Sequence, residues 1–205
     1  MIENKLFVES FMPADIDVRE ALRYAGVRGK SEDARRLLLE CSSELCGKIK
    51  TTVVYKILPF RVCEGEVDFG FASVRSSDLE KRLNGAWRVV FCAMTIGLEV
   101  DRLIAKYERI SAAKALIMSA LGSERAEALA DAFCDELSKR FKKEGCSLTA
   151  RFSAGYGDLP IEFQRDIFNQ LTPEKYIGLT LGDSFMMSPV KSVTAIMGVI
   201  GNGVS

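Results

Sequence analysis

The sequence predicts a single α+β domain, because segments with helical and strand periodicity follow one another in mixed order. The chain has 205 residues, which suits one large domain or two small ones. It contains no internal repeat and no linker long enough to force a domain boundary. We therefore expect one domain over residues 1–205, with N-terminal helices and strands in 1–146 and a motif-bearing part in 147–205.

The first 50 residues predict two helices. Asp17 is placed to cap a short helix that Gly26 ends, and Ser31 to cap a longer one. An apolar stripe marks the buried face of the longer helix: Ala34, Leu38, Cys41 and Leu45.

Strands dominate the next stretch. Residues 51–58 are β-branched and aromatic, and a second, less regular strand is expected near Val67. Residues 76–83 predict a short polar helix. The continuous apolar run 86–93 is typical of a buried central strand, and Trp87 within it is expected in the core.

Three helices are expected next, over 97–107, 112–121 and 123–144. The third has the strongest pattern, an apolar repeat every four residues: Leu129, Phe133, Leu137 and Phe141. After Gly145 the expected elements are a strand 147–152, a loop 155–160, a helix 161–171 and a helical turn opened by Pro173.

The tail is rich in Ser, Thr and Met and predicts short strands, with breaks at Pro189 and Gly198.

Composition excludes several classes of function. Lys plus Arg and Asp plus Glu each number 28, so the net charge of zero gives no long-range attraction to nucleic acid or to a membrane. The absence of His excludes Ser-His-Asp and Cys-His catalysis and the zincin helix. Six scattered Cys suggest reduced thiols, and we expect a cytoplasmic protein with neither a signal peptide nor a membrane span.

Common catalytic motifs are missing from the sequence. There is no phosphate-binding G-x-x-x-x-G-K-[ST], no G-x-S-x-G, and no G-x-G-x-x-G after a strand. Carboxylate pairs such as Asp135-Glu136 and Glu64/Glu66 are expected to be solvated.

The candidate site is the loop 151–160, RFSAGYGDLP, which follows a predicted strand. Arg151 offers a fork for a carboxylate, Tyr156 an aromatic face, and Gly155 close approach of the backbone to a ligand. The alternative interpretation is an ordinary strand-to-helix turn with an exposed Arg and a packed Tyr.

Three stretches together resemble the S-adenosylmethionine-binding activation domain of cobalamin-dependent methionine synthase. The first is R-x-x-x-G-Y followed by Pro, at Arg151, Gly155, Tyr156 and Pro160. The second is I-G-L-x-L, within 176–181. The third is S-F-x-M-x-P-x-x-S-V, at Ser184, Phe185, Met187, Pro189, Ser192 and Val193. The first 150 residues match loosely, through Ile16-Asp17 and the T-I-G turn at 95–97.

The resemblance implies a twisted, mostly antiparallel sheet with flanking helices, and a site for S-adenosylmethionine. Arg151 would hold the carboxylate of the ligand, Tyr156 would flank its adenosyl or sulfonium part, and Gly155 with Ala154 would form the close turn. Asp17 would accept the amino group, although a helix N-cap explains Asp17 equally well.

The resemblance also implies partners. The chain would be an accessory component, not a complete enzyme, that supports reductive remethylation of inactive cobalamin held by a methionine synthase chain, with an electron donor such as flavodoxin. The absence of His agrees with cobalamin bound on the partner. Two alternatives stay open: a non-catalytic module that docks on a corrinoid protein without binding the ligand, and an independent small-molecule methyltransferase.

Overall fold

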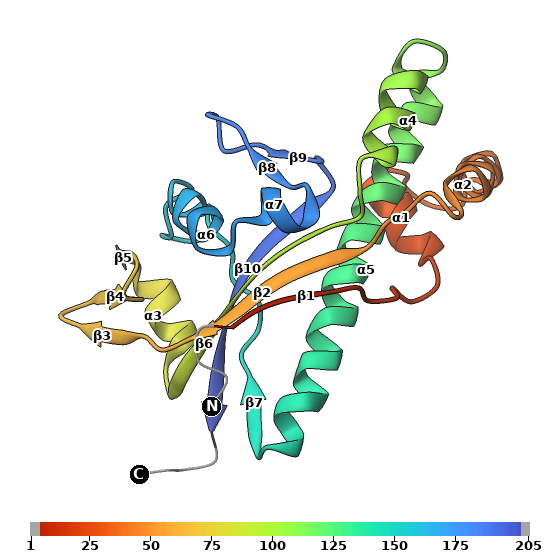
Figure 1. Ribbon diagram of the computed structural model, residues 1–205. Coiled ribbons are helices and arrows are strands. Elements are labelled where there is room, and N and C mark those ends of the chain that lie inside the picture. Colours follow the sequence, from red (N-terminus) through yellow and green to blue (C-terminus); the bar gives the residue numbers. More distant parts are fainter. Residues whose placement is uncertain (1–4, 202–205) are drawn as a thin grey trace.

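The computed structural model describes residues 5–201 and is built around a five-stranded antiparallel sheet (Figure 1). Its strand order is β1-β2-β6-β10-β7. The strands are β1 (Leu6–Glu9), β2 (Thr52–Leu58), β6 (Ala86–Thr95), β10 (Ser192–Gly201) and β7 (Cys146–Leu148). The register of the central strand β6 is shown by its last residue, Thr95, which lies opposite Thr52 of β2 on one side and Ser192 of β10 on the other.

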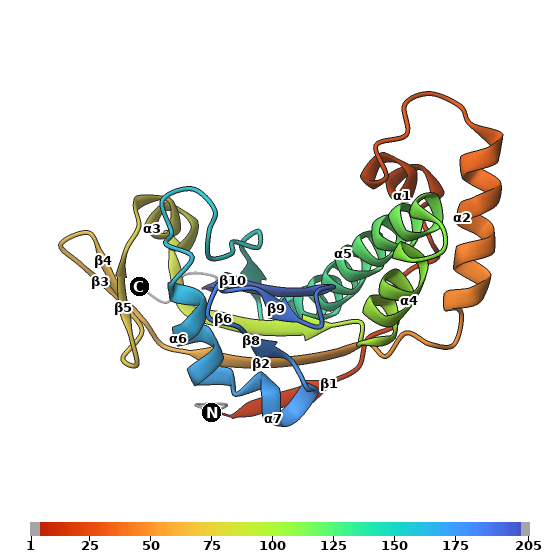
Figure 2. The ribbon, with the colours of Figure 1, turned by 90° about the horizontal axis from the view of Figure 1, so that it is seen from above.

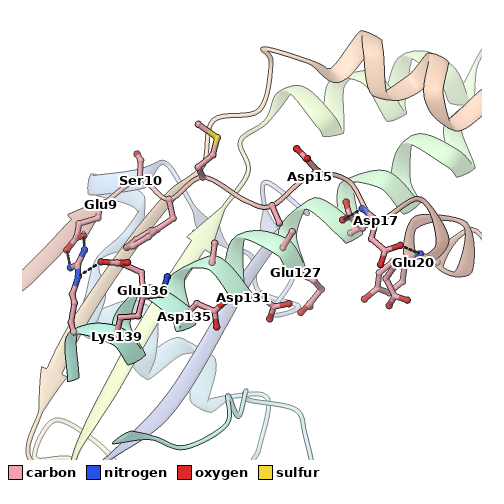
Figure 3. Close-up of a pocket in the computed structure, with 18 residues that line it drawn as sticks. Glu9, Ser10, Asp15, Asp17, Glu20, Glu127, Asp131, Asp135, Glu136 and Lys139 are labelled. Carbon is pink, nitrogen blue, oxygen red and sulfur yellow. Dashed lines mark hydrogen bonds and ion pairs between the residues drawn. The ribbon is translucent and has the colours of Figure 1, made fainter. Parts of the chain in front are cut away.

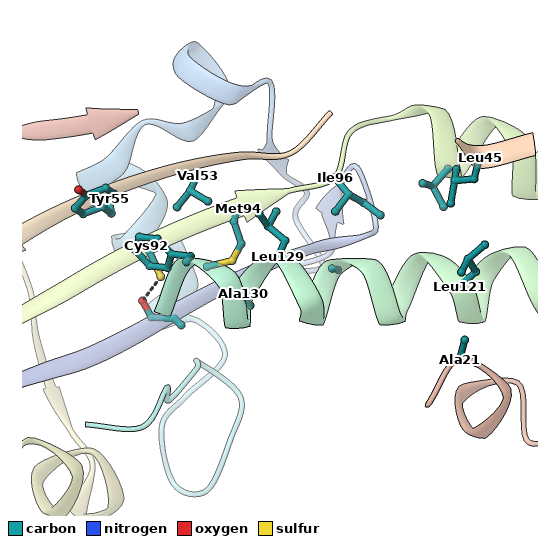
Figure 4. Packing of buried hydrophobic residues seen from close by; sticks show 14 of the residues in the cluster. Ala21, Leu45, Val53, Tyr55, Cys92, Met94, Ile96, Leu121, Leu129 and Ala130 are labelled. Atoms are coloured by element: carbon teal, nitrogen blue, oxygen red, sulfur yellow. Dashed lines mark hydrogen bonds between the residues drawn. The ribbon is translucent and has the colours of Figure 1, made fainter. Parts of the chain in front are cut away.

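One face of the sheet is covered by the long helix α5 (Ala112–Lys143). Three further helices pack on α5 beyond the end of the strands (Figure 2): α1 (Val18–Tyr24), α2 (Glu32–Leu45) and α4 (Glu99–Glu108). Alternate strand residues point towards α5, and Figure 4 shows Val53, Cys92 and Met94 packed against Leu129 and Ala130. This alternation follows from the two-residue period of a strand.

The opposite face carries a second apolar cluster. Its helices are α3 (Ser77–Leu83), α6 (Phe163–Leu171) and α7 (Pro173–Ile177). Phe91 is fully buried there and its ring lies 4.9 Å from that of Phe69. A small sheet completes this side: β3 (Arg61–Cys63), β4 (Glu66–Asp68) and β5 (Ser73–Arg75). In Figure 2 this small sheet lies at one end of the long strands, and α1, α2 and α4 gather at the other.

The predicted α+β class and most predicted helices are confirmed. Asp17 and Ser31 cap α1 and α2 through side-chain oxygens, as expected, and Ser76, which was expected to be the first residue of its helix, caps α3 in the same way. Two predicted helices are instead one, because α5 runs without interruption for 32 residues through Gly122. A Cβ on Gly122 would come within 2.6 Å of the Val100 side chain, so this glycine permits close helix packing and does not end a helix.

Other sequence predictions were wrong in detail. The irregular strand near Val67 is a hairpin of two short strands with a turn at Glu64 and Gly65, both at positive φ. The tail forms the hairpin of β8 (Thr180–Leu181) with β9 (Met187–Ser188), and then the ten-residue β10, which passes through Gly198. A Cβ on Gly198 would lie 2.9 Å from the Cβ of Ala86, so the close packing at this position leaves no room for a side chain.

Trp87 does not belong to the core. It is 51% exposed at the start of β6, before the buried part of that strand begins. The six cysteines are all free thiols, and Cys41 and Cys92 are buried as small core residues. Within residues 5–201, none of the helices has the length and apolar character needed to cross a bilayer.

Candidate functional site

Arg151 lies against helix α5. After β7 the chain stays beside β10, where Thr149 donates its backbone N–H to Gly198 and Phe152 forms a bridge with Ile196. This path brings Nη2 of Arg151 to 3.2 Å from Glu127 and 2.7 Å from Asp131. Nη2 makes both contacts, so Nε and Nη1 have no hydrogen-bond partner among the described residues.

The loop after Arg151 is held in a fixed shape. Gly155 has φ of +86° and donates its N–H to Leu159. Asp158 accepts hydrogen bonds from Ser76 and Ser77 at the start of α3. The hydrogen bond from the Ser76 hydroxyl holds the pKa of Asp158 well below its usual value.

The loop and β10 enclose a cleft of about 530 Å³. Arg151, Ala154 and Tyr156 line this cleft, together with Glu127 of α5. Gly155 is not on the wall; a side chain there would press on Ile161. We refer to this space as the Arg151 cleft.

The alternative of an exposed Arg with a packed Tyr is wrong. The Arg151 side chain is only 24% exposed, whereas Tyr156 is 68% exposed with its ring at the rim. A half-buried cation and an exposed aromatic ring are the reverse of the normal preference of these residues.

Buried polar residues support the base of the Arg151 cleft. Ser153 donates to the carbonyl of Thr194 at 2.6 Å, and the Thr194 hydroxyl lies 3.3 Å from the amide oxygen of Gln164. Thr194 and Gln164 are both almost completely buried. Side chains joined in this way have few alternative rotamers, which gives the cleft a defined floor.

Asp17 lies in a different but adjoining space, a groove of about 960 Å³ between α5 and residues 9–24. We refer to it as the acidic groove. Oδ1 of Asp17 accepts from the N–H groups of Arg19 and Glu20, so the N-cap role is confirmed. Asp17 and Glu20, three residues apart, do not form a capping box, because the N–H of Asp17 donates to Glu124 and not to Glu20.

Carboxylates follow α5 along the acidic groove. Figure 3 shows Glu127, Asp131 and Asp135 in a row, spaced four residues apart, with Asp15 and Asp17 across from the helix. Glu127 lines both spaces and therefore joins the acidic groove to the Arg151 cleft. An acid-lined groove attracts cationic groups.

The structure thus brings Arg151, Ala154 and Tyr156 together, and connects Asp17 to them through Glu127. Sequence reasoning missed Glu127 and Asp131. The two acids are like charges at i, i+4, a spacing that slightly disfavours a helix, but the local sequence does not show which cation compensates them. Among residues 5–201, no group of three His, Cys, Asp or Glu side chains could hold a metal ion.

Comparison with known proteins agrees with this architecture. Residues 80–201 match the family model described as the vitamin B12 dependent methionine synthase activation domain. A crystal structure of the MetH reactivation domain bound to AdoHcy superimposes with a TM-score of 0.70 at 17% identity, covering 98% of this chain and 81% of that chain. A search of curated proteins finds no match. The chain belongs to the family of vitamin B12 dependent methionine synthase activation domains.

Proposed function

We propose that the chain binds S-adenosylmethionine across the Arg151 cleft and the acidic groove, and that it supports reductive remethylation of cobalamin held by a partner chain. The observation that carries the proposal is Arg151, which has two guanidinium nitrogens without a hydrogen-bond partner among residues 5–201 and lies in the same cleft as an exposed aromatic ring. Membership of the activation-domain family supports it, as does the structural similarity to the MetH reactivation domain bound to AdoHcy.

The chemistry of the residues fits this ligand. S-adenosylmethionine carries a carboxylate, an ammonium and a sulfonium, and supplies an activated methyl group when bound. The free nitrogens of Arg151 suit the carboxylate, and the Tyr156 ring suits the adenine or the sulfonium. The remaining oxygen of Asp17 and the row on α5 suit the positive groups.

Catalysis by this chain would consist of positioning. A sulfonium methyl group needs no proton transfer before it leaves, so the absence of His is no obstacle. The partner would bind cobalamin, and an electron donor such as flavodoxin would reduce it. We place the complex in the cytoplasm.

Calorimetric titration with S-adenosylmethionine tests the proposal. Arg151→Ala should weaken binding at least about tenfold, because it removes the charged partner of the carboxylate. Arg102→Ala, which removes an exposed arginine on α4, is the matched control and should bind like the unmodified chain. Absence of heat with the unmodified chain at high concentration would overturn the proposal.

A second candidate is a docking module that binds no ligand. It is favoured by the two carboxylates that already neutralise Arg151. In that case a cobalamin-binding partner domain would co-purify equally well with the unmodified chain and with Arg151→Ala, and calorimetry would show no ligand binding.

A further inference from the structure

Two adjacent residues of α5 form a buried ion pair beside the acidic groove. Glu124 is 4% exposed and Arg125 is 6% exposed. Both carboxylate oxygens of Glu124 accept from Arg125, each at 2.5 Å. Adjacent residues of a helix do not normally face each other, so this pairing requires something outside the helix to orient the two side chains.

The segment before α1 provides that orientation. Arg125 donates to the carbonyl of Ala14 at 2.6 Å and to the carbonyl of Asp15 at 3.2 Å. Glu124 accepts the N–H of Asp17 at 3.1 Å. The pair therefore bonds to three backbone groups within four residues, and all three of these residues, Ala14, Asp15 and Asp17, line the acidic groove.

Stability alone does not explain such a pair. Well-packed apolar side chains commonly replace a buried ion pair without loss of stability, whereas a planar guanidinium fixes several acceptors in one geometry. The acceptors here are backbone atoms of a segment without helix or strand, which no neighbouring strand could hold in place.

We infer that Glu124 and Arg125 are positioning residues, which hold segment 14–17 so that the Asp17 carboxylate faces the ligand site. The inference rests on the proposed function, in which Asp17 accepts the ligand's amino group. Oδ1 of Asp17 is occupied by the helix cap, so the orientation of the backbone decides where Oδ2 points.

The test is a double-mutant cycle on the affinity for S-adenosylhomocysteine, measured by calorimetry. Arg125→Lys keeps the charge but loses the planar guanidinium that bonds to several acceptors at once, and it should weaken binding about fivefold or more. Asp17→Asn keeps a good N-cap, loses the charge, and should also weaken binding. In the double variant, Arg125→Lys should add no further loss, because it acts only through Asp17.

Glu44→Gln is the control for a general loss of stability. Glu44 ties α2 to Lys106 and Tyr107 of α4, far along the chain from the ligand site. It should lower the melting temperature without changing affinity. If Arg125→Lys behaves like this control, or weakens binding equally with and without the Asp17 charge, the inference is wrong.

Hydrogen exchange separates this inference from the proposed function. The Asp17 amide should exchange slowly in the unmodified, ligand-free chain and at least about tenfold faster in Arg125→Lys. Equal exchange in both chains would overturn the inference even if the ligand binds. Failure of the unmodified chain to bind would overturn the proposed function, and with it the role of the pair at a ligand site.

Discussion

Two residues of the candidate site, Arg151 and Tyr156, have degrees of burial that are unusual for their residue types. Arg151 is half-buried and Glu127 and Asp131 compensate its charge, although both carboxylates are largely exposed and solvent screens these contacts. Tyr156 remains exposed although it could contribute apolar burial elsewhere. Both choices are understandable if a ligand completes the environment of the two side chains.

Glu9 gives a prediction at this scale. Its carboxylate accepts two hydrogen bonds from Arg140 and one from Tyr55, and the Arg140 hydrogen bond lowers the pKa of Glu9 below its usual 4.5. Because the folded pKa is depressed, this stabilisation is present above about pH 4.5 and is lost as pH falls through the folded pKa. Arg140 is partly exposed, so solvent screening limits the effect.

Glu9→Gln should therefore lower the free energy of unfolding by about 1 kcal/mol at pH 7. Urea unfolding at several pH values is the measurement, and the difference from the unmodified chain should shrink below pH 4.5. Glu136 also forms an ion pair with Arg140 but does not connect α5 to β1. Glu136→Gln should therefore lower the free energy of unfolding by less than Glu9→Gln does. If the difference in unfolding free energy between the two chains did not depend on pH, the stabilising role of the Glu9 carboxylate would be contradicted.

Among whole elements, the helix caps were predictable because they are local. Asp17 and Ser31 stand directly before helical patterns, and their side-chain oxygens cap those helices. The continuity of α5 was not predictable, because Gly122 is retained for a contact with Val100 that comes from another helix. The short strands of the small sheet carry too few residues for a two-residue period to be recognised.

Gly122→Ala tests that explanation, because helix propensity and packing predict opposite signs for the change in the free energy of unfolding. Alanine in a helix interior is normally about 1 kcal/mol more favourable than glycine. Here the new Cβ would lie 2.6 Å from a buried side chain, so we expect a net loss of about 1–3 kcal/mol in the free energy of unfolding. Thermal and urea unfolding measure it. Ser138→Ala on the same helix should be neutral or slightly stabilising, and a stabilising Gly122→Ala would refute the packing argument.

The candidate site was predictable only in part. The motif loop identified Arg151, Ala154 and Tyr156, and these residues share one cleft. Glu127 and Asp131 were missed because acids on a helix are usually solvated, and nothing local indicates that an arginine 20 residues later will lie against them. Contacts between distant parts of a chain depend on the order of strands, which the pattern of one segment does not encode.

In the whole molecule, the two apolar clusters share the same strands. Residues of β6 alternate between them: Val90, Cys92 and Met94 face one cluster, while Val89, Phe91 and Ala93 face the other. If these strands came apart, the apolar side chains of both clusters would be exposed to water. We therefore expect residues 1–205 to unfold as one cooperative unit, in keeping with a single domain.

Matched core substitutions measure this cooperativity. Phe133→Leu in the first cluster and Phe163→Leu in the second should each cost about 1–2 kcal/mol. Urea unfolding followed by circular dichroism and by the fluorescence of Trp87, the only tryptophan, should give coincident transitions in both variants. Separate midpoints for the two signals would show that the layers unfold independently.

Helix α5 also bears on the entropy of ligand binding. It carries the pair that holds Asp17, the carboxylates that hold Arg151, and Arg140, which holds β1. Residues 124–140 span about 24 Å of one uninterrupted helix, so these anchor points have a fixed separation before any ligand arrives. Most of the conformational freedom at the candidate site was therefore lost when the chain folded, and the proposed ligand binding would cost little further conformational entropy.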